Sequence, residues 1–397
     1  MTYKIGLVGK PSVGKSTLFN AATMNDVPEG AYPFTTIDPS VGEAYVRVEC
    51  AAPEFDGDHD CTPNHGFCRD GVRYVPVKLV DVAGLVPGAH EGRGLGNQFL
   101  TDLNEADVLV HVVDFSGTTD IEGEATEGHD PREDIDFLEN ELDMWYLDIL
   151  EKGIERHETG YNGAEGDIEE DLAEQMSAFR TNEDEIKQVV LSLDLELDPA
   201  TWDDDDRAAL AREIRIRTKP MIVAANKMDT PAAQDNYDEI TSDPEYDHLT
   251  VVPVSAHAEK ALKTADEQGA VEYRPGAAEF DIAGDVSGEQ AAGLEQIRGF
   301  VDDFGGTGVQ SALETALFEE FGAKAVFPGN GSPRDNGEFL QDCFILPDHA
   351  TAEDFAYFLH SDIGEGFLHG IDARSGRQVG ADTTLDHRDV VEVVTTN

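Results

Sequence analysis

The chain has 397 residues, of which 40% are hydrophobic and 8% aromatic, a composition that excludes a disordered protein and allows roughly two to three domains. Its 82 acidic and 28 basic residues give a formal net charge of −54. Its four cysteines are too few for a disulfide scaffold, and its longest apolar runs are too short to span a membrane.

The acidic residues are spread along the whole chain, and the longest purely acidic run covers only 203–206. Such a charge repels itself at ordinary ionic strength, whereas at about 1 M salt the Debye length falls to roughly 3 Å and screens the repulsion. This pattern favours a protein of a hypersaline cytoplasm over one with an acidic tail. Because the sequence starts directly with a strand and not with a signal peptide, we expect a cytoplasmic protein.

The first predicted strand, 3–8, leads into the glycine-rich segment GKPSVGKS at 9–16 and then into a helix. The backbone N–H groups of such a loop wrap phosphates at the N-terminus of a helix. Lys15 is expected to reach the β- and γ-phosphates, and the Ser16 hydroxyl is expected to bind Mg²⁺. The predicted nucleotide-binding residues of this segment are Gly9, Pro11, Ser12, Val13, Gly14, Lys15, Ser16 and Thr17.

Two further segments suit the γ-phosphate and its metal ion. Thr36, with Thr35 as the positional alternative, lies in a predicted loop and offers a hydroxyl to Mg²⁺ and an N–H to the γ-phosphate. Asp81 follows the predicted strand 74–80 and begins the sequence DVAG. Asp81 would hold Mg²⁺ through water, and Gly84 would donate its N–H to the γ-phosphate.

Many GTPases place a glutamine directly after this glycine to orient the attacking water, but here the position is Leu85. His90 and Arg93 follow in a glycine-rich stretch and are candidates for this role, although a solvated loop explains them equally well. The predicted catalytic residues are Lys15, Thr36, Gly84 and His90.

The stretch between the predicted strands 108–113 and 220–225 is longer than a compact nucleotide-binding domain needs. It has apolar residues at helical spacing on both sides of a glycine-bearing turn at 160–166. We expect a projecting helical hairpin, with helices packed on the sheet as the alternative. The apolar positions are Ile135, Leu138, Leu142, Trp145 and Ile149, then Ile168, Leu172, Met176 and Phe179, and finally Ile186, Val190 and Leu193.

The sequence NKMD at 226–229 follows a strand and is expected to read the base. The Asp229 carboxylate can accept hydrogen bonds from the ring N–H and the exocyclic amine of guanine, a donor pair that adenine lacks. Lys227 would cover the base plane, and backbone groups after the predicted strand 249–254 would close over the base. An ordinary strand-to-helix cap is the alternative. The predicted base-binding residues are Asn226, Lys227, Asp229, Ser255 and Ala256.

Apolar strands that alternate with helices predict an α/β fold with a doubly wound, mostly parallel sheet. The segment that follows 254–256, up to residue 302, is acidic and expected to be irregular, and 308–318 is the last predicted helix of this domain. A small β-grasp module follows, with strands at 325–328, 343–346 and 390–394 and a helix at 352–361. The expected domains are a G domain at 1–119 and 216–321, a helical insertion at 120–215 and the β-grasp domain at 322–397.

Together these motifs closely resemble the YchF/Obg-like ATPase branch of the Obg family, and its archaeal members most of all. The resemblance rests on YPFTTIDP at 32–39, DVAGLVPGA at 81–89, GLGNQFL at 94–100 and HRDVV at 387–391, which is similar to the end of a TGS domain. It implies a ribosome-associated P-loop nucleoside triphosphatase with Mg²⁺ as cofactor, GTP or GDP as ligand and the ribosome or its RNA as partner. In this family a hydrophobic residue, here Leu85, replaces the glutamine.

The sequence departs from this family pattern at two positions. Relatives usually carry glutamate where this chain has Asp229, and they prefer ATP, so we expect this chain to bind and hydrolyse GTP. An ATPase of the same architecture and a slow-turnover nucleotide-binding scaffold are the alternatives. Obg-type loops often have an asparagine that is linked to K⁺ activation at the position of Ser12. The serine argues against K⁺ activation of this chain, whereas a salt-rich cytoplasm would supply abundant K⁺, so K⁺ stays a candidate ion.

Two groups of residues lie outside these motifs. Cys50, Cys61 and Cys68, with His59 and His65 among them, are of the types that bind Zn²⁺, but they include no C-x₂₋₄-C pair, so an ordinary loop is the preferred interpretation. Cys343 lies in an apolar strand and is a core candidate.

A basic group stands out from this acidic chain. It would either contact rRNA phosphates or, as we prefer, form ion pairs with the aspartates of 203–206. No DNA or membrane partner is expected. The basic residues are Arg212, Arg215, Arg217 and Lys219.

Overall fold

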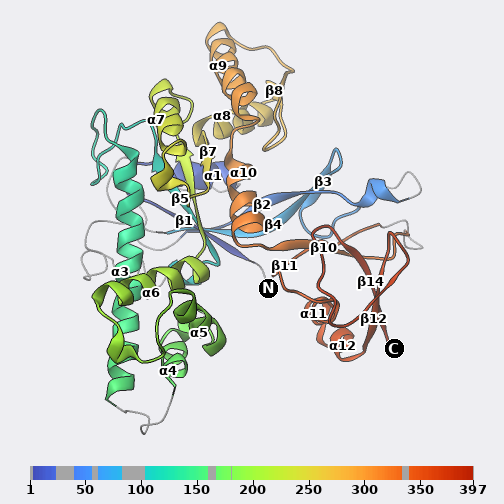
Figure 1. Cartoon of the computed structure of the whole chain (residues 1–397). Helices are drawn as coiled ribbons and strands as arrows, with labels where there is room; N and C mark the ends of the chain where they lie inside the picture. Colours follow the sequence, from blue (N-terminus) through green and yellow to red (C-terminus); the bar gives the residue numbers. More distant parts are fainter. Residues whose placement is uncertain are drawn as a thin grey trace.

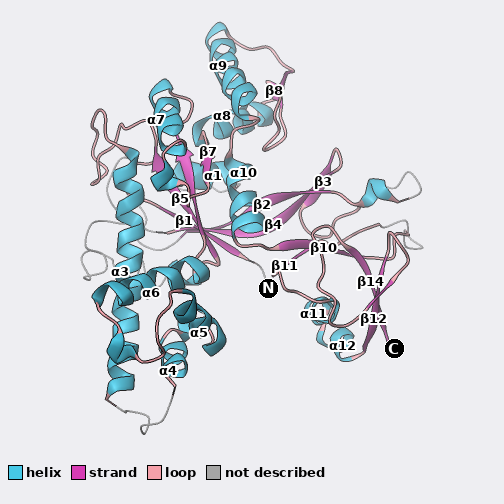
Figure 2. Ribbon diagram, in the orientation of Figure 1, coloured by secondary structure: helices cyan, strands magenta, loops and turns pink. Residues whose placement is uncertain are grey.

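A computed structural model of the chain describes residues 3–23, 40–55, 61–82, 103–159, 167–179, 181–332 and 339–396. These residues form a central sheet flanked by helices, a helical insertion on one side of it, and a C-terminal sheet with two helices on the other (Figures 1 and 2). None of the described helices is both long enough and apolar enough to cross a membrane.

The central sheet has seven strands within the described residues, in the order β2-β4-β1-β5-β6-β7, with β3 also paired to β4. Strands β4, β1, β5, β6 and β7 are parallel, whereas β2 and β3 run antiparallel to β4. This confirms the predicted mostly parallel sheet, whose apolar strands are buried on both faces. The strands are β1 Lys4–Val8, β2 Ser40–Glu49, β3 Phe67–Arg69, β4 Val72–Asp81, β5 Val108–Asp114, β6 Met221–Asn226 and β7 Val251–Pro253.

Helices cover this sheet, and one of them, α9, lies in a segment that was expected to be irregular. The stretch before residue 302, expected to be irregular, contains the 17-residue helix α9, which begins at a capping box formed by Ser287 and Gln290 and ends at Gly305 with φ 73°. The predicted last helix is α10, which continues through a π-helical turn, Thr315–Glu320. The helices are α1 Lys15–Ala22, α7 Pro231–Thr241, α8 Ala256–Glu267, α9 Gly288–Phe304 and α10 Val309–Glu314, and a short hairpin of β8 Val271–Glu272 and β9 Asp281–Ile282 separates α8 from α9.

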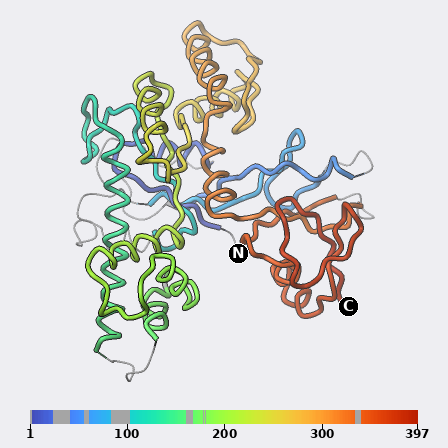
Figure 3. The backbone as a smooth tube through the Cα atoms, viewed as in Figure 1, coloured from blue at the N-terminus to red at the C-terminus, as the bar shows by residue number. Residues whose placement is uncertain are grey.

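The chain leaves the sheet after β5, forms the helical insertion and returns at β6 (Figure 3). The insertion is not the two-helix hairpin that the sequence suggested, because the second set of apolar positions is divided between two helices and a further helix, α6, packs along α3. Asp130 caps α3 by accepting a hydrogen bond from the N–H of Arg132, and Pro131 is its first residue. The helices are α3 Pro131–Glu158, α4 Ile168–Gln175, α5 Glu183–Ser192 and α6 Asp204–Thr218.

Helix α3 serves two hydrophobic cores. Leu138 and Leu142 in its first half pack against the sheet, in a cluster with Val8 and Leu109. Its second half joins α4, α5 and α6 in a separate core that includes Leu150 and other buried apolar residues of all four helices. The first half of α3 is therefore packed on the sheet, as the alternative interpretation expected, and its second half belongs to a separate four-helix core.

The C-terminal domain is a five-stranded sheet in the order β11-β10-β14-β12-β13, with two helices. Its strands β10 and β14 pair in parallel. Parallel pairing needs a crossover connection, and the predicted β-grasp module has one. Phe327 and Val390 share one hydrophobic cluster with Val46 and Val75 of the central sheet, so the two domains pack on each other. The elements are β10 Lys324–Pro328, β11 Phe344–Leu346, α11 Ala352–Leu359, α12 Ser361–Glu365, β12 Phe367–Asp372, β13 Gln378–Val379 and β14 Val390–Thr395.

Candidate nucleotide-binding site

The loop between β1 and α1 has a conformation that requires glycine at two positions. Gly9 and Gly14 have φ angles of 146° and 95°. A Cβ atom at Gly9 would lie 2.4 Å from the carbonyl oxygen of Val112, and one at Gly14 would lie 2.4 Å from Nδ2 of Asn226. The loop therefore folds tightly against the ends of β5 and β6. Between the two glycines lie Pro11, Ser12 and Val13, of which Val13 is buried and Ser12 has a φ of 64°.

Asp81, at the carboxyl end of β4, lies beside the first residues of α1. Its Oδ2 accepts a hydrogen bond of 3.0 Å from the Ser16 hydroxyl, and its Oδ1 lies 3.4 Å from Nζ of Lys15. The Asp81 side chain is fully buried, and among the described residues no hydrogen-bond donor reaches its Oδ1. A buried carboxylate beside a hydroxyl, with one oxygen that makes only a 3.4 Å ion pair with Lys15, suits Mg²⁺, which prefers oxygen ligands.

Thr36, Gly84, Leu85 and His90, together with the alternative candidates Thr35 and Arg93, lie outside the described residues. Their roles stay predictions.

The predicted base-binding residues are connected by hydrogen bonds to the phosphate loop. Nδ2 of Asn226 donates to the carbonyl oxygen of Val13 at 2.8 Å, and Oδ1 of Asn226 accepts from the N–H of Ala256 at 3.2 Å. The Ser255 hydroxyl donates to Oδ1 of Asp229 at 2.7 Å. Because Asp229 is exposed, its other carboxylate oxygen is free to accept hydrogen bonds from a ligand.

A cavity of about 820 Å³ opens in front of these groups. Gly14 and Thr17 line it on the phosphate side, and Asn226, Lys227 and Asp229 line it on the base side. Its remaining wall comes from α8 and α9. Two predicted phosphate-loop residues and most of the predicted base-binding residues therefore line one space of the size that ligands occupy. A larger cavity, of about 1060 Å³, lies between the insertion and the C-terminal domain, and none of the predicted nucleotide-binding residues lines it.

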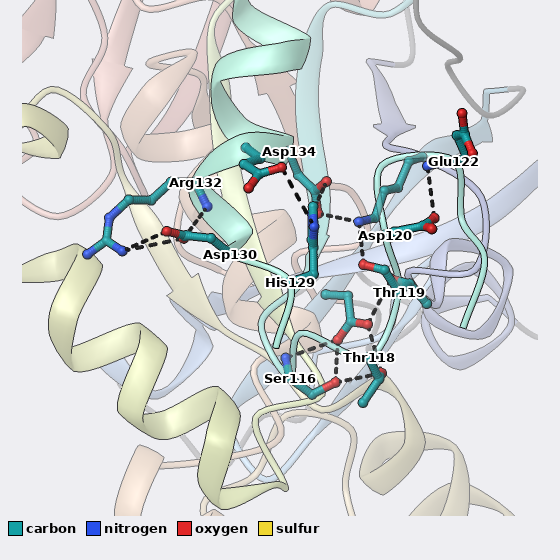
Figure 4. A network of polar contacts seen from close by, with 12 residues as sticks. Ser116, Thr118, Thr119, Asp120, Glu122, His129, Asp130, Arg132 and Asp134 are labelled. Carbon is teal, nitrogen blue, oxygen red and sulfur yellow. Dashed lines mark hydrogen bonds and ion pairs between the residues drawn. The ribbon is translucent and has the colours of Figure 1, made fainter. Parts of the chain in front are cut away.

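Asp114, at the end of β5, was not among the predicted site residues. Its Oδ2 accepts a hydrogen bond of 2.8 Å from Nζ of Lys227 and bonds of 2.9 Å from the hydroxyls of Thr118 and Thr119. Burial opposes ionisation of this carboxyl, but the hydrogen bonds from Lys227 and Ser116 prevail and lower its pKa. Figure 4 shows Ser116, Thr118 and Thr119 gathered in this network.

This network changes the expected role of Lys227. Its ammonium group is bound to Asp114, so its aliphatic stem is the part that can cover a base. The signal for Asp114 was present in the sequence, because it follows an apolar parallel strand at the same sheet edge as Asp81.

Lys10 fixes the phosphate loop to the start of α3. Its buried ammonium donates to the carbonyl oxygen of Thr119 at 2.8 Å and lies 2.8 Å from Oδ2 of Asp134. The other oxygen of Asp134 lies 2.9 Å from Nε2 of His129, in the pair visible in Figure 4. Burial, and secondarily the charge of Lys10, lowers the pKa of the neighbouring His111 to about 3, so His111 is neutral here.

A buried carboxyl group supports the segment that would close over the base. Glu259 of α8 is fully buried, and its Oε2 accepts hydrogen bonds from the hydroxyls of Tyr273 at 2.6 Å and Thr307 at 2.5 Å. The carbonyl oxygen of Thr307 in turn accepts from the N–H of Ser255 at 2.9 Å. Burial raises the pKa of Glu259.

The four basic residues at the end of α6 do not form one exposed patch. Arg215 is buried and pairs with Asp143 at 2.8 Å, and Lys219 is buried and donates to the carbonyl oxygen of Ala106 at 2.7 Å. The expected ion pairs with 203–206 are wrong, because Asp203 caps the opposite end of α6 and the arginines pair instead with carboxylates of α3 and of α6 itself. Arg215 and Lys219 are therefore not available to RNA phosphates, whereas Arg212 and Arg217 are exposed and each pairs with a neighbouring carboxylate.

Three family models match the chain. Residues 4–147 match the model described as 50S ribosome-binding GTPase, residues 224–330 match the Obg-like GTPase YGR210-like, G4 motif-containing domain, and residues 327–395 match the TGS domain.

Similar proteins span nearly the whole chain. An uncharacterized GTP-binding protein of Methanocaldococcus jannaschii is 41% identical over 98% of both chains, and one of Schizosaccharomyces pombe is 36% identical over 88% of both. The ribosome-binding ATPase YchF of Pasteurella multocida is 30% identical over 79% of this chain and 84% of its own. Among solved structures, a GTP-binding protein of Pyrococcus horikoshii superposes with a TM-score of 0.76 at 35% identity, covering 99% of this chain and 100% of its own.

Proposed function

Because this chain belongs to the Obg-like GTP-binding proteins that carry a C-terminal TGS domain, we propose that it is a GTP-hydrolysing switch that acts with Mg²⁺ on the ribosome. The observation that carries the proposal is the hydrogen-bonded path from the phosphate loop to the base site. Val13 is bound to Asn226, Asn226 to Ala256, and Ser255 to Asp229. This path fixes the distance between phosphate-binding and base-reading groups before any ligand binds.

Guanine is the base that this site suits. Ser255 occupies one oxygen of Asp229 and orients the carboxylate, whose remaining acceptor capacity matches the paired N–H donors of guanine. Adenine presents no such pair and would leave the carboxylate without donors. The alternative is ATP hydrolysis, which is favoured by the similarity to the ribosome-binding ATPase YchF.

The phosphate end provides charge and fixed hydrogen-bond donors. Lys15 brings a positive charge to the transferred phosphoryl group, and the loop from Gly9 to Gly14 offers backbone N–H groups at the N-terminus of α1. When bound, Mg²⁺ neutralises charge that develops between the β- and γ-phosphates, and Ser16 and Asp81 are the groups that would hold it. Thr36 and Gly84 would bind the γ-phosphate, and His90 would position water in place of the glutamine.

The proposed setting is the ribosome in a salt-rich cytoplasm. One matching family model and the YchF relatives carry ribosome binding in their names, which supports a ribosomal partner. The net charge of −54 supports high salt, because self-repulsion of that size needs screening.

Multiple-turnover hydrolysis tests the proposal. GTP hydrolysis would be measured in multimolar KCl with Mg²⁺, with and without ribosomes, for the native protein and for Lys15→Ala, and KCl would be replaced by NaCl to reveal any K⁺ requirement. We expect ribosome-stimulated turnover that Lys15→Ala abolishes. Turnover that ribosomes leave unchanged would contradict the ribosomal switch, and tight GTP binding without turnover would identify a scaffold.

A further inference from the structure

Three cysteines that are separated in the sequence meet at the end of the β2–β4 ladder. Cys50 directly follows β2, Cys61 precedes β3, and Cys68 lies within β3. Their Sγ atoms all lie within 4.8 Å of one another. The chain brings them together because β3 pairs with β4, with Cys68 opposite Arg73, while the N–H of Cys50 donates to the carbonyl oxygen of Gly71 at 2.8 Å.

We propose that Cys50, Cys61 and Cys68, with Cys343 of the C-terminal domain as the fourth ligand, bind a structural Zn²⁺ ion that joins the central sheet to the TGS domain. Zinc takes four thiolates at about 2.3 Å in a tetrahedron, which places neighbouring sulfur atoms roughly 3.8 Å apart. The three thiols already meet this condition within the movement of a side chain.

Cys343 is the one remaining cysteine of the chain; it directly precedes β11 of the C-terminal domain and is not one of the three thiols that already lie within 4.8 Å of one another. It packs against the same hydrophobic cluster as Cys61 and Cys68. The carbonyl oxygens of Leu340 and Gln341, in the segment that leads to Cys343, accept hydrogen bonds from Arg73, which lies opposite Cys68 in the β3–β4 pair. Zinc would bind Cys343 as a thiolate.

Backbone hydrogen bonds hold the Cys61 loop against the segment that leads to Cys343. The N–H of Thr62 donates to the carbonyl oxygen of Phe339 at 2.9 Å, and the N–H of Asn64 donates to the carbonyl oxygen of Gln341 at 2.8 Å. The ligands on the two domains are therefore presented by segments that already run side by side.

Arg73 supplies a buried positive charge next to the cluster. It is 1% exposed and donates to the carbonyl oxygens of Leu340 and Gln341, while no acceptor among the described residues reaches its Nε. A tetrathiolate zinc centre carries a net charge of about −2, whose burial needs compensation.

The position of this site defines its role. The β2–β4 ladder runs from Ser40 opposite Asp81, at the proposed magnesium site, to Glu49 opposite Val72, beside the cysteines. A metal ion there lies at the far end of the ladder from the nucleotide, so it would stabilise the domain junction and take no part in hydrolysis.

The full-length protein, purified with a reductant, tests the proposal through its metal content and its Co²⁺ spectrum. We expect one Zn²⁺ per chain, four thiols that react with a thiol reagent only after chelation, and intense thiolate-to-Co²⁺ charge-transfer bands typical of a tetrahedral site. Absence of stoichiometric metal after incubation with Zn²⁺, a Co²⁺ spectrum without these bands, or a disulfide among the three clustered cysteines would overturn it.

Single substitutions separate the ligands. Cys61→Ser should lower Zn²⁺ affinity at least 100-fold, whereas His65→Ala, at an exposed position in the same loop, should leave one Zn²⁺ bound. Cys343→Ser should weaken binding and shift the Co²⁺ bands, and an unchanged spectrum would refute the assignment of Cys343. The native Co²⁺ spectrum decides the central claim even if a cysteine variant fails to fold.

Discussion

The side-chain amide of Asn226 donates a 2.8 Å hydrogen bond to the backbone carbonyl oxygen of Val13. Its oxygen accepts from the N–H of Ala256, so one buried side chain joins the phosphate loop, the end of β6 and the start of α8. Gly14 allows this approach, because a Cβ atom there would lie 2.4 Å from the same amide nitrogen.

Asn226→Ala should weaken GTP binding by roughly 10- to 100-fold. The substitution leaves the carbonyl of Val13 and the N–H of Ala256 without partners, at about 1–3 kcal/mol for each buried group. Isothermal titration would measure the affinity. Asn236→Ala is the matched control, because Asn236 donates to the carbonyl oxygen of Phe115 outside the nucleotide cavity. Equal losses of affinity in the two variants would contradict the specific role of Asn226.

Asp114→Ala should lower the free energy of unfolding by about 3 kcal/mol, because it leaves Lys227 and several hydroxyl groups without their common acceptor. Lys227→Met removes one partly exposed donor and should cost less. Because the folded-state pKa of Asp114 is below its ordinary value of 3.8, its contribution is present above that pH and is lost as the pH falls further. Urea unfolding measures both effects, and a larger loss for Lys227→Met would refute this hierarchy.

The free energy of unfolding of Glu259→Gln should rise relative to that of the native protein as the pH rises. Burial raises the pKa of Glu259 above its ordinary value of 4.5, so the stability that its protonated form contributes is present below pH 4.5 and is lost as the pH rises through the folded-state pKa. Glutamine still accepts from Tyr273 and Thr307 but does not ionise. Urea unfolding across a pH series compares it with Glu267→Gln on the exposed side of α8, and parallel curves for all three proteins would disprove the argument.

Ser16→Ala should remove most of the gain in GTP affinity that Mg²⁺ provides. The hydroxyl lies 3.0 Å from Asp81 and is one of two oxygen groups available to the ion in the described residues at this edge. Titrations of GTP with and without Mg²⁺ would quantify the gain, which Ser16→Thr should restore because it keeps the hydroxyl. A full Mg²⁺ effect in Ser16→Ala would show that the ion is held elsewhere.

The sequence was sufficient for features that depend on local chemistry. The phosphate loop needs positive φ angles at Gly9 and Gly14, and this requirement appears in the sequence as glycine at both positions. The buried strands of the sheet appear in the sequence as apolar runs. Asp81 and Asn226 followed from the rule that ligands bind at the carboxyl ends of parallel strands. The mostly parallel sheet and the C-terminal TGS domain were therefore correctly predicted.

Features that depend on long-range packing were missed. Asp114 meets Lys227 only because β5 and β6 are neighbours, and strand order is not written in local spacing. The sequence contains the capping box of α9, Ser287 and Gln290, but the segment was predicted to be irregular because it is acidic. The three clustered cysteines lack a short motif, and pairing of β3 with β4 brings them together.

Side-by-side binding of GTP and ATP, in multimolar KCl with Mg²⁺, tests the central claim most directly, with the native protein and Asp229→Glu. The account predicts that the native protein binds GTP at least roughly 100-fold more tightly than ATP and that Asp229→Glu relaxes this preference, because the carboxylate held by Ser255 reads the paired donors of guanine. Comparable or tighter binding of ATP by the native protein would contradict the guanine assignment and favour an ATPase.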